Sequence, residues 1–128
     1  MKKERYNEIG GIILDGSITV HRELGPGLLE SAYEIALARE LELRGLKVKR
    51  QVVVEFIYKD VDLGKVYVMD MLVEDEIILE IKSAELYQPI FDAQLITYLK
   101  LATKKLGYVI NFNVLLLKDG FKRIVYKF

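Results

Sequence analysis

The chain has no cysteine and a single histidine, His21. The absence of cysteine excludes a disulfide scaffold, a thiolate zinc site and a cysteine nucleophile. One histidine cannot build a multi-histidine metal cage within a subunit. Any metal ligands must therefore be oxygen atoms, which favours Mg²⁺ or Mn²⁺ over zinc or copper. His21 precedes a glycine–proline break and is interpreted as a surface or capping residue rather than a catalyst.

Long apolar runs and an excess of one charge are also missing. No stretch approaches the roughly 20 apolar residues that span a bilayer, and the N-terminal MKKERYNE lacks the apolar core of a signal peptide. We therefore expect a cytoplasmic protein that does not bind a membrane. The 19 basic and 19 acidic residues cancel. This balance argues against tight autonomous binding to nucleic acid, because strong phosphate binders carry a basic excess.

The chain does contain enough apolar material for one core. Its 128 residues, 52% of them apolar, with 2 prolines and 9 glycines, predict a single domain over residues 1–128. Apolar positions at helical spacing predict helices at about 6–23, 28–44 and 89–103, and β-rich runs predict strands at 52–58, 65–73, 77–82, 108–114 and 121–128. The order α-α-β-β-β-α-β-β predicts an α/β or α+β fold with a mixed central sheet flanked by helices.

Two carboxylates and a lysine share one face of two neighbouring predicted strands. Glu80 and Lys82 point the same way because side chains alternate along a strand. If residues 74–76 form the hairpin loop, Asp70 lies opposite Glu80, with Cβ atoms about 5 Å apart. Such a pair is costly among apolar neighbours unless cations neutralise it. A divalent metal with Lys82 would do so and would suit phosphodiester hydrolysis. The alternative is a buried or half-buried salt bridge.

The second predicted helix offers a further carboxylate. Glu30 lies in line with Leu37 and Leu41, which predicts a core-facing position beside Tyr33. A helix that covers the sheet would aim Glu30 at the acidic pair. The alternative is an edge glutamate with its head in water.

The third predicted helix carries Gln94 and Tyr98 one turn apart on one face. Gln94 has the chemistry to hydrogen-bond substrate or a metal-bound water, and Tyr98 to bind phosphate or stack on a base. The alternative is a helix flank with a half-buried tyrosine.

Taken together, these residues resemble the PD-(D/E)XK nuclease superfamily and, within it, the GxxExxY family. The motifs stand here as Gly27-Leu28-Leu29-Glu30-Ser31-Ala32-Tyr33, Asp70-Met71-Leu72-Val73, Glu80-Ile81-Lys82 and Gln94-Leu95-Ile96-Thr97-Tyr98. They occur in the family's order and the resemblance covers nearly the whole chain. Met69 precedes Asp70, so the proline of the superfamily's Pro-Asp pair is absent.

The resemblance implies a restriction-endonuclease-like core and a metal-dependent nuclease. Its implied metal ligands are Asp70, Glu80, the Ile81 carbonyl and Glu30. Lys82 would position water or stabilise charge, which makes Asp70, Glu80, Lys82 and Glu30 the implied catalytic group. The implied substrate contacts are Gln94, Tyr98 and Tyr33.

Three functions stay open on the sequence, the third being hydrolysis of a free nucleotide or another phosphoester. The leading one is Mg²⁺- or Mn²⁺-dependent cleavage of DNA or RNA. The alternative is a nuclease-fold binding or assembly module in nucleic-acid processing that has lost catalysis. The basic residues available to follow a nucleic-acid backbone are Lys47, Lys49, Arg50, Lys100, Lys104 and Lys105. A homodimer through the late strands or the first helix is also left open.

Overall fold

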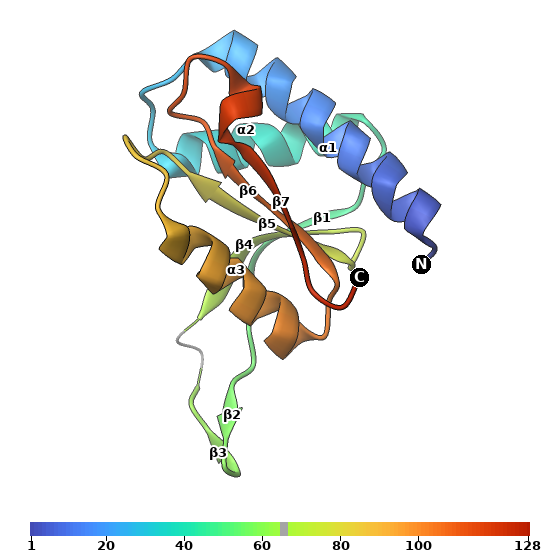
Figure 1. The fold of residues 1–128 in the computed structure, drawn as a ribbon. Helices are drawn as coiled ribbons and strands as arrows, with labels where there is room; N and C mark the ends of the chain where they lie inside the picture. Colours follow the sequence, from blue (N-terminus) through green and yellow to red (C-terminus); the bar gives the residue numbers. More distant parts are fainter. Residues whose placement is uncertain (65–66) are drawn as a thin grey trace.

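The computed structural model describes residues 1–64 and 67–128. Its framework is a five-stranded sheet in the order β1-β4-β5-β6-β7 (Figure 1). The strands are β1 (Val48–Val53), β4 (Val68–Val73), β5 (Ile77–Lys82), β6 (Leu106–Asn111) and β7 (Phe121–Val125). Strands β5 and β6 are parallel and the other neighbouring pairs are antiparallel. The sheet is therefore mixed, as the sequence predicts.

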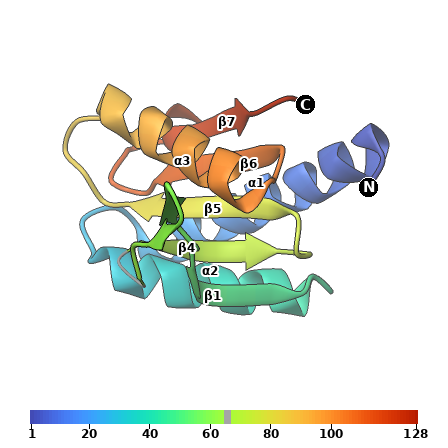
Figure 2. The ribbon, with the colours of Figure 1, turned by 90° about the horizontal axis from the view of Figure 1, so that it is seen from below.

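Helices cover both faces of this sheet (Figure 2). The helices are α1 (Lys3–Leu24), α2 (Glu30–Leu43) and α3 (Pro89–Ala102). The first two pack on one face and α3 packs on the other. Helix α3 also links β5 to β6, because parallel strands need a crossover connection. This arrangement confirms the predicted fold class. None of the helices in the described ranges is both long and apolar enough to cross a membrane.

Alternation along β5 divides the core into two clusters. Ile77, Leu79 and Ile81 pack toward α1 and α2, whereas Ile78 packs toward α3. Because side chains alternate, Glu80 projects on the α3 side, as Ile78 does.

Gly107 of β6 allows α3 to lie close to the sheet. A Cβ atom at this position would lie 2.7 Å from the carbonyl oxygen of Ile78 and 2.9 Å and 3.0 Å from the Leu95 methyl carbons. These distances are shorter than van der Waals contact, so a side chain here would displace Leu95 and the helix that carries it. The position of α3 thus depends on the missing side chain of Gly107.

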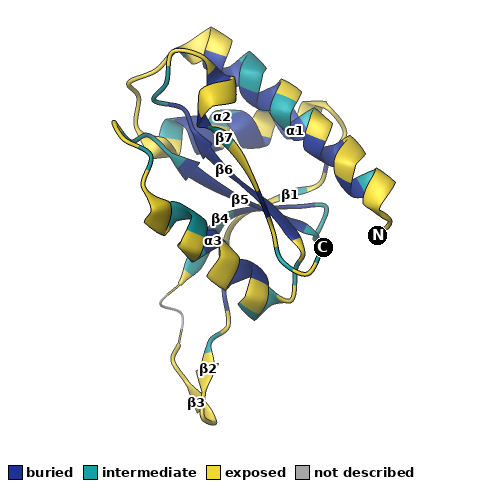
Figure 3. Ribbon diagram, viewed as in Figure 1, coloured by how far each residue is buried: buried dark blue, intermediate teal, exposed yellow. Residues whose placement is uncertain are grey.

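A separate two-stranded sheet, β2 (Ile57–Tyr58) and β3 (Val61–Asp62), projects from the body as an exposed hairpin (Figure 3). The single strand predicted over 52–58 is therefore wrong. The chain leaves the main sheet after β1, and Lys59 and Asp60, with φ of 47° and 69°, form a two-residue turn of the kind that closes hairpins. The next predicted strand begins at Lys65, but residues 65 and 66 lie outside the described part of the chain.

Several other boundaries differ from the predicted ones. The strand predicted at 108–114 is β6 at 106–111, and the turn predicted at 118–120 belongs to a short 3₁₀ helix, η1 (Leu117–Gly120). The surface interpretation of His21 is wrong. This side chain is buried, and its Nε2 atom lies 2.7 Å from the carbonyl oxygen of Val114. It thereby joins α1 to the segment that follows β6.

Tyr33 belongs to the core. It is fully buried, and its ring stacks on Phe112 with centroids 4.5 Å apart. Its hydroxyl donates a hydrogen bond to the carbonyl of Gly25 and accepts one from the amide of Leu28 at 3.0 Å. The predicted substrate contact of Tyr33 is therefore wrong, because the ring has no exposed surface and the hydroxyl holds the loop before α2.

We expect Tyr33→Phe to lower the free energy of unfolding by about 1 kcal/mol, because the two backbone groups lose a hydrogen-bond partner. Urea unfolding followed by circular dichroism would measure the change. Tyr58→Phe is the matched control, since that residue is 57% exposed in the β2–β3 hairpin. Equal losses in both variants would contradict a structural role of the Tyr33 hydroxyl.

Candidate active site

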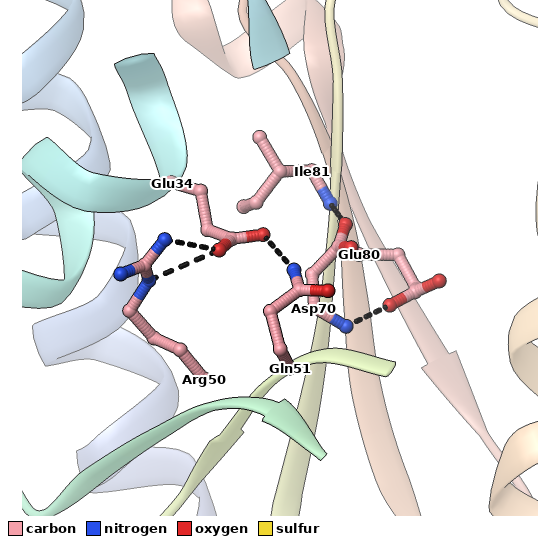
Figure 4. A network of polar contacts seen from close by, with 6 residues as sticks. All are labelled: Glu34, Arg50, Gln51, Asp70, Glu80 and Ile81. Carbon is pink, nitrogen blue, oxygen red and sulfur yellow. Dashed lines mark hydrogen bonds and ion pairs between the residues drawn. The ribbon is translucent and has the colours of Figure 1, made fainter. Parts of the chain in front are cut away.

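The candidate site forms where the ladder between β4 and β5 ends. Its last pair is Met71 with Leu79, and the next residues along the strands are Asp70 and Glu80. Beyond this pair, the two carboxylates accept the backbone N–H groups that a carbonyl of the neighbouring strand would accept in a continued ladder (Figure 4). The Asp70 amide donates to Glu80 Oε2 at 2.8 Å, and the Ile81 amide donates to Asp70 Oδ2 at 2.7 Å. Each carboxylate is thus fixed in place by the opposite strand.

Both carboxylates are buried enough that the loss of water opposes their ionisation. Glu80 is 4% exposed. Burial, and then the charge of Asp70, raises the pKa of Glu80 to about 8. Burial also raises the pKa of Asp70. A bound cation would favour the ionised form of this pair.

One oxygen of each carboxylate is free of hydrogen bonds within the described residues. These atoms are Asp70 Oδ1 and Glu80 Oε1. No buried side-chain oxygen or nitrogen in this part of the chain lacks a partner, so both free oxygens reach solvent. The described residues place no group of three or more histidine or acidic side chains to hold a metal ion. A cation here would take its other ligands from the backbone, water or substrate, as Mg²⁺ commonly does.

Lys82 lies beside the acidic pair at the end of β5. Its Nζ atom is 4.8 Å from the centroid of the Phe91 ring on α3. Among the residues that the structure describes, it forms no ion pair with Asp70 or Glu80. The salt-bridge arrangement that the sequence left open is therefore not the one found. The ammonium is still near, because its charge opposes the rise in the pKa of both carboxylates.

A glutamate that sequence reasoning missed, Glu34 of α2, is buried near the site (Figure 4). Arg50 donates to its Oε2 atom from Nε at 3.0 Å and from Nη2 at 2.7 Å, and Gln51 donates to its Oε1 atom at 2.8 Å. After burial and other causes, the charge of Glu34 adds to the pKa rise of both site carboxylates. Glu34 therefore forms part of the electrostatic surroundings of the site.

Glu30, the helix residue that the sequence did select, is exposed, so the predicted core-facing position is wrong. It lines a shallow hollow with Ser83, which follows β5 directly. Its charge is the smallest of the causes that raise the pKa of Asp70. Glu30 thus lies at the rim of the site. Helical spacing from Leu37 and Leu41 pointed to Glu34 equally well, three and seven positions away.

Gln94 and Tyr98 line a hollow of about 240 Å³ against α3. Phe56 and Tyr67, whose ring centroids are 5.8 Å apart, line it too. Burial, and then the charges of the two site carboxylates, raises the pKa of Tyr98, which indicates that its hydroxyl is near the acidic pair. Sequence reasoning missed Phe56 and Tyr67 because both lay within predicted strands, where aromatic residues are ordinary.

A family model described as the PD-(D/E)XK nuclease superfamily matches residues 7–124. The match includes α2, β4, β5 and α3, which carry the acidic residues, Lys82, Gln94 and Tyr98, and β1, which carries Arg50 and Gln51. No curated protein and no solved structure matches the chain.

Proposed function

Because the chain belongs to the PD-(D/E)XK nuclease superfamily, we propose that it hydrolyses nucleic-acid phosphodiester bonds with Mg²⁺ or Mn²⁺ held by Asp70 and Glu80. The observation that carries this proposal is the end of the β4–β5 ladder. Each carboxylate there accepts one backbone N–H and turns its other oxygen to solvent. The pair is fixed in position and forms no ion pair within residues 1–64 and 67–128, and a cation would neutralise it.

The Ile81 carbonyl is proposed as a third metal ligand. The Ile81 amide points toward β4, and the N–H and C=O of a strand residue point to the same neighbour. Its carbonyl therefore faces the gap that holds the carboxylates. Two carboxylates, a carbonyl and water form the hard oxygen set that Mg²⁺ and Mn²⁺ prefer. When bound, the cation supplies polarisation of the phosphate and activation of water.

Lys82 is proposed to position the attacking water or to stabilise charge on the phosphate. Its ammonium rests on the Phe91 ring, so its three donors are available to water and phosphate. Glu30 at the rim is proposed to join the ligand set through its carboxylate. Gln94 would contact an adjoining nucleotide by hydrogen bonding. Tyr98, whose ring is buried, would offer its hydroxyl to a phosphate in the hollow that it lines.

The finer assignment to the GxxExxY family rests on the loop before α2. Gly27 has a φ of 94°, a conformation in which a side chain is strained. The Tyr33 hydroxyl bridges Gly25 and Leu28 in the same loop. In this proposal the glycine and tyrosine of the motif shape the turn, and the turn brings Glu30 to the rim of the site.

Metal titration tests the proposed function. Wild-type protein and the variant Asp70→Asn/Glu80→Gln would be titrated with Mn²⁺ and Mg²⁺ while the melting temperature is followed, and both would be assayed on labelled single- and double-stranded DNA and RNA. Binding to the native state stabilises it by about 2.7 kcal/mol at 100 times Kd. We expect this shift, together with cleavage, in the wild type and neither in the variant.

If metals leave the melting temperature unchanged and no substrate is cut, the nuclease proposal fails. The alternative of a nuclease-fold binding or assembly module would then take its place.

A further inference from the structure

The neutral net charge conceals a strong segregation along the chain. Residues 93–128 contain seven basic residues and one acidic residue, Asp119. Residues 1–92 carry the opposite excess. This last part of the chain forms most of α3 together with β6 and β7, which lie next to each other (Figure 2). This part of the chain therefore carries a basic excess that overall composition does not reveal, although Lys122 is paired with Asp92 at the start of α3.

Four of these basic residues surround one hollow, which we call the lysine hollow. It measures about 290 Å³ and is lined by Lys100, Thr103, Lys104, Lys105, Tyr126 and Lys127. The Tyr126 amide donates to the Lys105 carbonyl at 2.9 Å, which fixes the end of β7 against the segment after α3. Across residues 1–64 and 67–128, no ion pair engages any of the four lysines. Their charges are therefore available to an external anion.

The other basic residues selected from the sequence are neutralised within the protein. Lys47 and Lys49 both pair with Asp75, at 2.9 Å and 2.8 Å, and Arg50 pairs with Glu34. All three stand on or next to β1, the edge of the sheet opposite β7. The six-residue set predicted to follow a nucleic-acid backbone thus divides into a paired group at one edge and an unpaired group at the other.

The lysine hollow follows, along α3, the hollow lined by Phe56, Tyr67, Gln94 and Tyr98, which we call the aromatic hollow. Thr97 and Leu101 line the aromatic hollow. Lys100 and Lys104 follow them at three-residue spacing and line the lysine hollow. Thr97 and Lys100 are neighbours on the surface of α3, because residues three apart on a helix have Cβ atoms about 5–6 Å apart. Lys104 follows just after the helix ends at Ala102. A path along α3 thus runs from Tyr98, near the acidic pair, to the lysines.

We propose that the lysine hollow binds backbone phosphates of the nucleic-acid substrate, on one side of the bond to be cut. This proposal rests on the proposed nuclease function. Phosphate neutralisation by lysine is independent of base sequence and fixes the register of the chain on the protein. The hollow would therefore supply affinity that the neutral net charge does not predict, while the acidic pair performs the chemistry beyond the other end of this path.

Two double variants with equal charge change test the proposal. Lys100→Gln/Lys105→Gln removes two exposed lysines of the hollow, and Lys47→Gln/Lys49→Gln removes two exposed lysines of the opposite edge. Binding of fluorescein-labelled DNA and RNA would be measured by anisotropy in EDTA, at several salt concentrations. We expect the first variant to lose roughly tenfold or more in affinity and its salt slope to fall by about 2. The second should bind as the wild type does.

A small substrate separates this proposal from the function on which it rests. Bis(p-nitrophenyl) phosphate has a single phosphate and none left to occupy the lysine hollow, so Lys100→Gln/Lys105→Gln should hydrolyse it at the wild-type rate with Mn²⁺. Equal weakening of oligonucleotide binding by both double variants, or unchanged binding by the first, would overturn the proposed phosphate site. If the wild type hydrolyses neither the small ester nor oligonucleotides, the nuclease function fails while the binding result stands on its own.

Discussion

Glu80→Gln is expected to remove nuclease activity and, at the same time, to make the metal-free protein more stable at pH 8. Activity should fall at least roughly 10³-fold, because the glutamine supplies no anionic ligand. Stability should rise because the amide oxygen still accepts the Asp70 N–H while the cost of ionising a buried group disappears. Cleavage rates with Mn²⁺ and urea unfolding in EDTA would measure the two effects.

The pKa of Glu80 determines the sign of the stability change. In the unfolded chain this carboxyl has a pKa of 4.5, and burial, followed by the charge of Asp70, raises the pKa to about 8 in the native state. Between those values the native state holds a proton that the unfolded chain has lost. The stability of the metal-free wild type therefore falls by a few kcal/mol as pH rises from about 5 to 8. The stability of Glu80→Gln should depend on pH much less.

Glu85→Gln is the control, because Glu85 is exposed in the segment after β5. It should keep both the activity and the pH dependence of the wild type. If Glu80→Gln were less stable than the wild type in EDTA at pH 8, the negative charge of Glu80 would have to be structural. That outcome would favour the assembly module over the nuclease.

Arg50→Ala should produce the largest loss of stability among these variants, about 2–4 kcal/mol. Its removal leaves Glu34, whose side chain is 7% exposed, as a buried carboxylate with Gln51 as its remaining donor. The expected loss lies below that of a fully buried pair because the Arg50 side chain is 40% exposed. Urea unfolding at neutral pH would measure it.

Arg44→Ala provides a matched comparison, since Arg44 also forms a 2.7 Å ion pair with a glutamate of α2, Glu40. The glutamate of that pair is more accessible, because the Glu40 side chain is 22% exposed and that of Glu34 is 7% exposed. Loss of the Arg44–Glu40 pair should therefore cost less than about 1 kcal/mol. Adding Glu34→Gln to Arg50→Ala should restore part of the lost stability. Similar losses in the two arginine variants would contradict a buried role for Glu34.

The β4–β5 hairpin could be predicted in detail because two local rules agreed. The acidic residues 74–76 favoured a short turn, and alternation then placed Asp70 opposite Glu80. The observed pairing of Val73 with Ile77 confirms that register. The point at which the β4–β5 ladder ends could not be predicted. It depends on the Asp70 and Glu80 carboxylates accepting backbone N–H groups, and a periodic sequence pattern carries no information on such bonds.

Other features escaped prediction because they depend on packing between distant segments. The choice between Glu30 and Glu34 depends on where α2 begins and on Arg50, which arrives from β1. The motif that contains Tyr33 predicts a contact with substrate. The ring instead stacks on Phe112, which is too distant in the sequence for a local pattern to reveal the contact. The neutral net charge argued against nucleic-acid binding for a different reason. A sum over the chain cannot show that four lysines gather around one hollow.

Gly107 sets how close α3 lies to the sheet, and α3 forms one wall of the proposed substrate path. One wall of that path is α3 with Gln94 and Tyr98, and the other is made by Phe56 and Tyr67 beside the exposed hairpin. Even a methyl group at position 107 would collide with the sheet and with the underside of α3. The added side chain would move α3 away from the sheet and thereby widen the hollow between α3 and the Phe56 and Tyr67 side chains. If the hollow holds substrate as proposed, a substitution at buried Gly107 would change which substrates fit without touching the hollow's own side chains.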